Sequence, residues 1–356
     1  MALYICGYLS EMKVTIIIPI RNEEKFIDKT LESIINQKFD GDLEIIISDG
    51  LSNDGTLEIV KKFQKKFKNI KLVRNAAKIV SVGFNKALNL ATGDIIIRVD
   101  GHSTLEPDFI KNSIRILNKK NASCVGGPTK HFSNTFIGKN ISIAQCSYFG
   151  AGGASFRTGV SKGKYVNTLA FGAYNRAEFL KVGAYDEELI RNQDEELNYR
   201  IVKNGGKIWI DPSIKSIYYV RNSIIKLFSQ YFYYGFYKVR VIQKIKSIFS
   251  LRHFVPAIFV LTLILLVVIA IFQKIFWPIF FLGGIYLLVN ITFSIYESVK
   301  SHAKSLVLLP VIYFIMHLSY GLGFLAGLVF FANRWRASSV VDNSFKKENF
   351  SLKVNA

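Results

Sequence analysis

The chain has 356 residues, half of them hydrophobic, and a formal net charge of +20 at pH 7. This length accommodates one domain of about 220–250 residues and a second region. The cysteines Cys6, Cys124 and Cys146 follow no metal or disulfide spacing, which favours a reduced, cytosolic setting. A basic cluster between Lys226 and Arg252 runs directly into long apolar runs. We therefore expect anionic lipid headgroups, and no nucleic acid, as the partner of this charge.

Up to about Arg252, buried strands alternate with charged helices. Strands are predicted at residues 13–20, 43–48, 70–73 and 95–99, and helices at 22–37, 80–90 and 193–203. The helix at 22–37 is predicted to begin with Asn22 as N-cap and two glutamates in its first turn. This alternation favours a doubly wound parallel sheet. A dinucleotide-binding Rossmann domain is disfavoured because no G-x-G-x-x-G follows the first strand, and no Walker A loop is present.

The strand at 95–99 ends in Asp100-Gly101-His102. Ligands of parallel sheets bind beyond the carboxyl ends of the strands, so Asp100 and His102 are expected to face that crevice. A carboxylate oxygen and an imidazole nitrogen one residue apart can share a divalent cation, Mn²⁺ or Mg²⁺. The alternative is that Asp100 caps the next turn and that His102 is an ordinary polar loop residue.

Eight motifs follow one another along the chain. They are IIIPIRNEE, SDGLSNDGT, GFNKALNLATGD around Asn85, RVDGH, GGP at 126–128, FGAY at 171–174, NQDEELNYR at 192–200 and QYFYYG from Gln230. Together they resemble family 2 glycosyltransferases, particularly the succinoglycan-type membrane enzymes that build exopolysaccharide on a lipid carrier. The resemblance covers about residues 12–330. It implies an α/β fold of the GT-A (nucleotide-diphospho-sugar transferase) class with a doubly wound mixed sheet. It also implies an inverting transfer from a nucleotide sugar, assisted by a divalent metal.

The resemblance implies roles for individual residues. The donor-binding residues would be Pro19, Arg21, Glu23, Asp49, Asn85 and Asp100. Carboxylates suit this task because they accept hydrogen bonds from uracil N–H or ribose hydroxyl groups. The family often has two consecutive acids at the position of Asp49, whereas here the second residue is Gly50. Asp100 and His102 stand at the metal-binding Asp-x-Asp position, with histidine in place of the second acid.

Asp194, in the first turn of the helix at 193–203, is the implied catalytic base that takes the acceptor proton. Without the resemblance, helix capping would be the favoured explanation of Asp194. Glu195 is the second candidate for the base, and Arg200 is expected to steady either the phosphates or the helix. Gln230 is a possible phosphate or acceptor contact. It stands where processive synthases carry Gln-x-x-Arg-Trp, but a Tyr-Tyr pair replaces Arg-Trp, so we expect transfer of one sugar. Residues 149–174 are predicted to form a flexible loop on the acceptor side.

The last third of the chain is expected to meet a membrane. Residues 222–253 combine aromatic and basic residues without an acid, which is typical of an amphipathic helix at headgroup level. The alternative is a basic helix packed on the domain. Apolar spans follow at 254–272, 275–295 and 305–331. Three crossings would leave the basic tail 332–356 outside, against the positive-inside tendency, and a re-entrant third span would return it inside.

The overall prediction is a multi-pass protein of the cell (inner or cytoplasmic) membrane. Residues 1–12 form an extension without a cleavable signal, and residues 13–221 form a cytoplasmic GT-A domain. The donor would be a nucleotide sugar, with UDP as the expected nucleotide, and the acceptor a polyprenyl-diphosphate-linked saccharide. One alternative is transfer to polyprenyl phosphate itself. A catalytically silent membrane scaffold or transporter subunit is disfavoured, because the spans carry almost no ionisable residue beyond His317.

Overall fold

The computed structural model describes residues 12–246, 250–302, 307–335 and 345. Contacts divide the chain into two compact units. The sheet unit comprises Met1–Lys130, Gly159–Tyr219 and Val340–Ala356, and the helical unit comprises His131–Thr158 and Val220–Ser339. The predicted domain boundaries placed residues 131–158 inside the 13–221 domain, whereas their contacts group them with the helical unit.

The sheet unit begins with the strand–helix alternation expected from the sequence. Its elements are β1 (Lys13–Ile20), α2 (Ile27–Ile35), β2 (Asp42–Asp49), α3 (Thr56–Lys66), β3 (Ile70–Arg74), α4 (Val80–Leu90), β4 (Ile95–Arg98), β5 (Ser103–Leu105), α5 (Phe109–Lys120), β6 (Cys124–Gly126), β8 (Lys164–Tyr165), β9 (Ala173–Asn175), α9 (Arg176–Val182), α10 (Gln193–Lys203), β10 (Ile208–Ile210) and β11 (Ser216–Tyr219). Strand β7 (Thr129–Phe132) begins in the sheet unit and ends in the helical unit.

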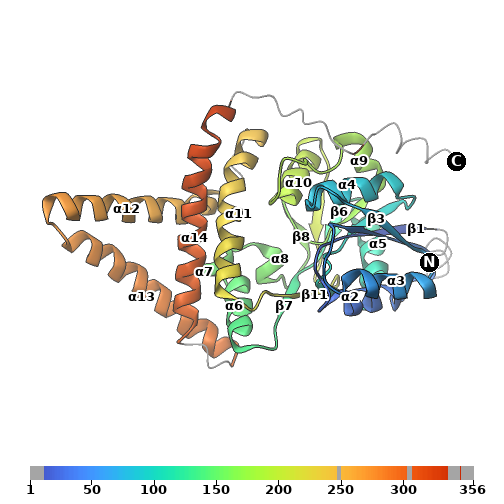
Figure 1. Ribbon diagram of the computed structural model, residues 1–356, viewed down its shortest axis with the longest axis horizontal. Coiled ribbons are helices and arrows are strands. Elements are labelled where there is room, and N and C mark those ends of the chain that lie inside the picture. The colour runs from blue at the N-terminus through green and yellow to red at the C-terminus, as the bar shows by residue number, and fades with distance from the viewer. Residues whose placement is uncertain (1–11, 247–249, 303–306, 336–344, 346–356) are drawn as a thin grey trace. The chain divides into compact units, whose positions relative to one another are not determined.

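In the described part of the chain, eight strands form one sheet in the order β3-β2-β1-β4-β9-β6-β10-β8. Strands β1 to β4 run parallel, whereas β9 runs antiparallel between β4 and β6. A smaller sheet has the order β5-β11-β7. Helices α2 and α3 lie on one face of the large sheet and α4 on the other (Figure 1). The predicted doubly wound α/β fold is confirmed, and antiparallel β9 makes the sheet mixed.

The centre of the sheet is apolar on both faces. Ile16, Ile17 and Ile18 of β1 are fully buried, and Ile96 and Ile97 of β4 are as well. Consecutive buried residues are typical of a parallel strand with helices on both sides. The apolar run of β4 ends at Arg98, so polar side chains follow at the carboxyl end of this strand.

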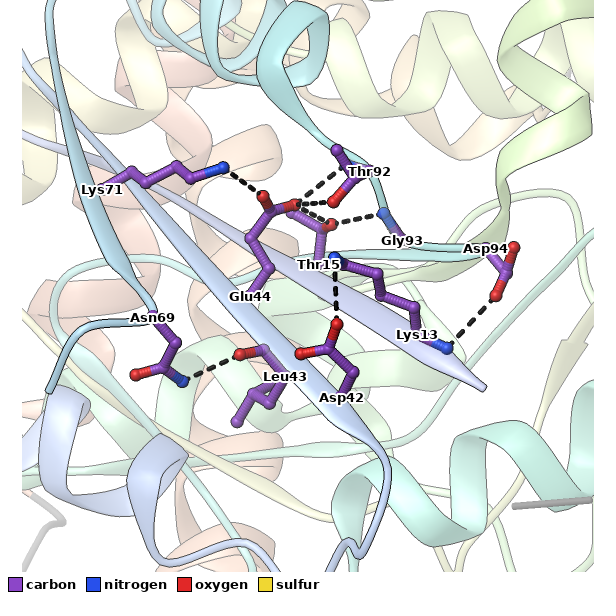
Figure 2. A network of polar contacts seen from close by, with 10 residues as sticks. All are labelled: Lys13, Thr15, Asp42, Leu43, Glu44, Asn69, Lys71, Thr92, Gly93 and Asp94. Atoms are coloured by element: carbon purple, nitrogen blue, oxygen red, sulfur yellow. Dashed lines mark hydrogen bonds and ion pairs between the residues drawn. The ribbon is translucent and has the colours of Figure 1, made fainter. Parts of the chain in front are cut away.

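A buried carboxylate connects the beginnings of the central strands (Figure 2). Glu44 Oε2 accepts hydrogen bonds from Thr15 Oγ1 (2.6 Å) and Thr92 N (2.9 Å), and Oε1 pairs with Lys71 Nζ (2.7 Å). Thr15 Oγ1 also accepts a hydrogen bond from Gly93 N (2.9 Å). Burial raises the pKa of Glu44, but the bonds from Lys71, Thr15 and Thr92 outweigh burial and lower it overall. This network lies away from the carboxyl ends of the strands, so we interpret it as structural.

The helix predicted at 22–37 is shorter than expected. Asn22 has a positive φ of 57°, and α2 begins only at Ile27. Instead of capping the helix, the Asn22 side chain accepts a hydrogen bond from Asn53 N (3.0 Å). The prediction of Asn22 as N-cap was therefore wrong. The left-handed backbone at Asn22 turns the chain away from β1 before a helix can start.

Residues 149–174 are not one loop, contrary to the prediction. They contain most of α7 (Tyr148–Ala151) together with α8 (Ser155–Thr158) and β8. Ser147 caps α7, and its Oγ accepts a hydrogen bond from Gly150 N (3.0 Å). Short helices of this kind lack the long apolar periodicity from which helices are predicted.

The helical unit contains α6 (Phe136–Cys146), α7, α8, α11 (Ile224–Ile245), α12 (Val255–Gln273), α13 (Trp277–Lys300) and α14 (Leu309–Phe330). Among the described residues, three helices are long and apolar enough to cross a membrane: Leu251–Gln273, Trp277–Lys300 and Leu309–Phe330. The span predicted at 275–295 thus extends to Lys300. Helices α11 and α14 lie side by side (Figure 1), and α14 is one unbroken helix.

Candidate active site

Arg98 and Asp100 lie where the central strand β4 ends. Arg98 is the last residue of β4, and its Nη2 pairs with Asp100 Oδ1 at 2.6 Å. Arg98 Nη1 lies 4.0 Å from Asp194 Oδ2. Although Arg98 is only 8% exposed, its Nε has no hydrogen-bond partner among the residues that the structure describes. One buried guanidinium thus stands between the two carboxylates for which the resemblance predicts metal binding and proton transfer.

Asp194 lies in the first turn of α10, which follows Asn192 in a left-handed conformation (φ 62°). Its Oδ1 accepts a hydrogen bond from Glu195 N at 2.9 Å, and its side chain is 31% exposed. Burial raises the pKa of Asp194, the charge of Arg98 lowers it and that of Glu195 raises it, with a net increase. A carboxylate with a raised pKa is a stronger proton acceptor. The geometry is therefore compatible with the predicted base, and Glu195 lies directly beside it.

Glu23 and His102 form a second pair close to the end of β4. His102 Nδ1 lies 2.8 Å from Glu23 Oε1, and the His102 ring stands edge-on to Tyr218 with centroids 4.8 Å apart. Asp100 and His102 therefore have different partners. Any metal contact from His102 would have to come from Nε2, because Nδ1 pairs with Glu23.

The metal prediction can be tested against the side chains that are available as metal ligands. The described residues contain no group of three or more His, Cys, Asp or Glu side chains that could hold a metal ion. Mg²⁺ is usually held by one or two carboxylates together with substrate phosphates and waters, so a single carboxylate is sufficient. Asp100, with its side chain 23% exposed, fits this chemistry.

The predicted donor-binding residues Pro19, Arg21 and Asp49 gather where β1 and β2 end. Pro19 is buried in β1 opposite Ser48, whereas Arg21 is exposed. Asp49 is 5% exposed and accepts a hydrogen bond from Ser52 Oγ at 2.6 Å. Asp49 therefore shapes the SDGLSNDGT loop, and its contact with a nucleotide stays a prediction.

Asn85, Arg200 and Gln230 make internal contacts. Asn85 is fully buried, and its amide bonds to both Tyr185 N (3.0 Å) and Tyr185 O (2.8 Å), so it positions the segment before α10. Arg200 pairs with Glu196 at 2.7 Å, which favours the expectation that it steadies the helix. Gln230 belongs to the helical unit, where its Nε2 donates to Tyr234 Oη at 2.8 Å.

Arg98 is the residue that the sequence reasoning missed. The sequence does contain a signal for this role, because the apolar run IIIR ends in a cation two residues before Asp100. A buried arginine is rarely found without a partner or a function. Here the partner is Asp100, two residues further along the chain.

Comparison with known proteins decides the family. The profile of glycosyl transferase family 2 matches residues 15–180. A Methanococcus voltae protein, dolichyl N-acetyl-α-D-glucosaminyl phosphate 3-β-D-2,3-diacetamido-2,3-dideoxy-β-D-glucuronosyltransferase, is 31% identical over 325 residues, which cover 89% of this chain and 97% of the relative. The chain belongs to glycosyltransferase family 2. This confirms the resemblance seen in the eight motifs.

Two further comparisons show which other proteins this glycosyltransferase resembles. Succinoglycan biosynthesis protein ExoA from Rhizobium meliloti is 30% identical over 250 residues, 70% of this chain and 76% of ExoA. A solved mannosyltransferase from Pyrobaculum calidifontis, in complex with GDP-Man and Mn²⁺, has a TM-score of 0.59 at 14% sequence identity. That match covers 89% of this chain and 87% of the mannosyltransferase. The shared architecture confirms the GT-A fold of this enzyme.

Proposed function

We propose that this glycosyltransferase transfers one sugar, with inversion, from a nucleotide sugar to a saccharide carried on a polyprenyl lipid. The observation that carries the proposal is Arg98, which pairs with Asp100 and faces Asp194 at the end of β4. The donor phosphates would bind on the Asp100 side, and the acceptor hydroxyl on the Asp194 side. UDP is the expected nucleotide.

Asp194 is the proposed base. Its carboxylate takes the proton of the acceptor hydroxyl while the oxygen attacks C1 of the donor sugar. The bond between C1 and the phosphate oxygen breaks, and the nucleoside diphosphate leaves with the electron pair. Attack from the face opposite the nucleotide inverts the anomeric centre. The raised pKa of Asp194 supports this assignment because it brings the acid closer to the operating pH.

Asp100 is the proposed ligand of a divalent metal, Mn²⁺ or Mg²⁺, with His102 as the second candidate. When bound, such an ion offsets the negative charge that develops on the departing diphosphate. Arg98 holds the Asp100 carboxylate in place through the 2.6 Å ion pair. The Mn²⁺ in the Pyrobaculum enzyme supports a metal, although it does not identify the ion used here.

The proposed acceptor combines a sugar, a phosphate and a prenyl chain. The name of the Methanococcus relative describes an acceptor that already carries N-acetylglucosamine on dolichyl phosphate, and ExoA is named for succinoglycan biosynthesis. These names favour a lipid-linked saccharide over bare polyprenyl phosphate. The sequence analysis predicts a diphosphate between sugar and lipid. The acceptor assay distinguishes this linkage from a single phosphate. The apolar helices would hold the enzyme in the cell membrane, with its sheet unit in the cytoplasm.

The test uses the full chain in purified membranes with a panel of nucleotide sugars, in Mn²⁺ or in EDTA. Acceptors are polyprenyl phosphate and polyprenyl-linked N-acetylglucosamine with one or two phosphates. We expect metal-dependent turnover of one donor, abolished by Asp100→Ala and reduced about 10²–10⁴-fold by Asp194→Asn. Asp42→Asn, on the surface with Lys13, is the matched control and should leave the rate unchanged. Full turnover in Asp194→Asn would refute the base assignment and point to Glu195.

A further inference from the structure

Helices α12 and α13 expose apolar side chains on all sides. Within the described part of these helices, buried residues are few: Ala257, Val260 and Ala270 in α12, and Asn290, Ser294 and Glu297 in α13. Where the two helices meet, Phe272 is 82% exposed and Phe280 75% exposed. Apolar helices of this length that are exposed all round require hydrocarbon as their surroundings.

Helix α14 is less apolar than α12, and it is covered except for one stripe and its last turn. Its buried residues run from Leu309 to Gly327. Val311, Phe314 and Val329 are exposed and Leu318, Leu322 and Leu325 are partly exposed, at a spacing of three or four residues that places them on one face of the helix. Leu328 and Phe330 at the end of α14 are exposed as well. A single apolar stripe is typical of a helix that lies in the plane of the membrane surface.

Helix α11 covers the opposite side of α14 over most of its length. A Cβ on Gly323 would lie 1.9 Å from Phe232 O, and one on Gly327 would lie 2.5 Å from Phe236 O. Further along, Gln243 Nε2 donates to Phe331 O at 2.8 Å. The residue numbers of both helices increase together, so α11 and α14 run parallel in close contact.

The composition of α11 does not suit a bilayer core. It carries Lys226, Lys238, Arg240 and Lys244, and it is not among the described helices apolar enough to cross. Lys226 and Lys238 are about 18 Å apart along the helix. If α14 crossed the membrane, α11 would have to enter the hydrocarbon with it, at a cost of about 2.5–3.5 kcal/mol for each cation at the centre.

The end of the hairpin at which α12 and α13 meet stands away from α14. Helix α12 contacts α14 near its own beginning, where the rings of Phe254 and Phe324 are 5.5 Å apart and Pro256 O faces Gly321. Helix α13 meets α14 from its middle onward, where Tyr286 Oη lies 3.0 Å from His317 Nδ1 and Asn290 Nδ2 donates to Pro310 O at 3.0 Å. The two helices project from α14 and meet at their far ends (Figure 1). Helices α12 and α14 therefore cannot both follow the membrane normal.

The chain returns to the sheet unit after α14. Phe345, the residue described after Trp335, is 7% exposed and is grouped by its contacts with the sheet unit. A chain that leaves the sheet unit at Tyr219 and returns to it at Phe345 begins and ends on the same side of a membrane. The number of crossings must then be even.

We infer that α12 and α13 cross the bilayer as a hairpin and that α14 lies in the headgroup plane beside α11. The membrane-binding part therefore consists of two spanning helices, α12 and α13, and two parallel interfacial helices, α11 and α14. Neither a third crossing nor a re-entrant third span is needed. Arg334 and Phe345, which follow α14, stay on the side of the sheet unit, in agreement with the positive-inside tendency. This arrangement depends on neither the donor nor the acceptor of the proposed reaction.

The first test determines on which side of the membrane single residues lie. The full chain, in vesicles of known orientation, is labelled with a membrane-impermeant maleimide. Single cysteines replace Lys274 between α12 and α13, Ser301 after α13 and Asn333 after α14. The unsubstituted chain is the control for its native cysteines. We expect Lys274→Cys to react from outside, and Ser301→Cys and Asn333→Cys to react only from the cytoplasmic side. Reaction of Asn333→Cys from outside would establish a third crossing, and protection of Lys274→Cys from outside would exclude the hairpin.

The second test measures how deep single residues lie in the bilayer. Spin labels are attached to these residues, and the accessibility of each label to oxygen and to a nickel chelate reports its depth. Labels at Val311, Leu318 and Leu325 on the exposed stripe of α14 should report one shared, shallow depth. Labels at Leu261, Leu265 and Phe272 of α12 are the matched series and should pass through the bilayer centre. A depth maximum at Leu318 would show that α14 crosses and would overturn the inference.

Discussion

At the scale of single residues, Arg98 links the proposed metal ligand to the proposed base. Its guanidinium pairs with Asp100 at 2.6 Å and lies 4.0 Å from Asp194. Arg98 lowers the pKa of Asp194 against the effect of burial, and so favours the ionised form of the base. Arg98 is thus a positioning residue whose charge acts through both carboxylates.

We predict that Arg98→Gln raises the pKa of Asp194, because it removes the cation that opposes burial. Activity requires the ionised base, so the acid limb of kcat/KM should move to higher pH. Arg98→Lys retains the charge and should leave the limb closer to that of the parent enzyme, with a lower kcat because the planar contact to Asp100 is lost. The pH profiles of both variants provide the measurement.

The control for this prediction is Arg115→Gln on the exposed surface of α5. It removes the same charge from the sheet unit, but Arg115 contacts Asn112 and Ser213 instead of the site. Its pH profile should match that of the parent enzyme. An acid limb that stays in place in Arg98→Gln would show that Arg98 does not tune the base.

At the scale of elements, the Glu44 network ties β1, β2 and β3 together (Figure 2). The folded-state pKa of Glu44 is lowered, so its stabilisation is fully present above the unfolded pKa and is lost as pH falls through the folded pKa. Glu44→Gln should therefore lose about 1.5–3 kcal/mol at neutral pH and progressively less in acid. Urea unfolding followed by Trp209 fluorescence, with Trp277 and Trp335 replaced by phenylalanine, measures this difference. Asp42→Asn, an exposed pair, should cost about 0–1 kcal/mol.

The close contact between α11 and α14 gives a second prediction at this scale. Gly323→Ala would place a Cβ 1.9 Å from Phe232 O, which forces the two helices apart. We expect a loss of about 1–3 kcal/mol, seen as a lower melting temperature in detergent. Gly283→Ala on α13 is the matched control, since nothing lies within 4 Å of its Cβ. Equal melting temperatures for the two variants would contradict the close contact between α11 and α14.

Much of this layout could be predicted from the sequence, and the reasons differ from element to element. Apolar runs predicted β1 and β4, and helical periodicity predicted α4 and α10. These predictions succeeded because the burial of apolar side chains determines the structure of those segments. The start of α2 was missed because the conformation of Asn22 depends on its bond to Asn53, far along the chain. The pairing of Arg98 with both carboxylates was missed for a similar reason, since α10 approaches β4 only in the folded protein.

At the scale of the whole molecule, the excess positive charge should act on the rate of substrate encounter. The chain has 46 Lys and Arg against 26 Asp and Glu, and Lys61, Lys62 and Lys65 are exposed on α3. Both proposed substrates carry phosphate groups. A field of this sign raises association rates by about 10–10³-fold at low salt, and added salt screens it. We therefore expect kcat/KM for the donor to fall with ionic strength, while kcat changes little.

Replacing Lys61, Lys62 and Lys65 by glutamine lowers the formal charge from +20 to +17 without touching the residues at the end of β4. The triple variant should have a lower kcat/KM at low salt and a flatter salt dependence, with the parent kcat. Arginine at the same positions should preserve the parent slope, because steering depends on charge more than on side-chain shape. If the glutamine and arginine variants had the same salt dependence, the α3 lysines would play no part in steering, and the remaining charge would have to act nearer the site.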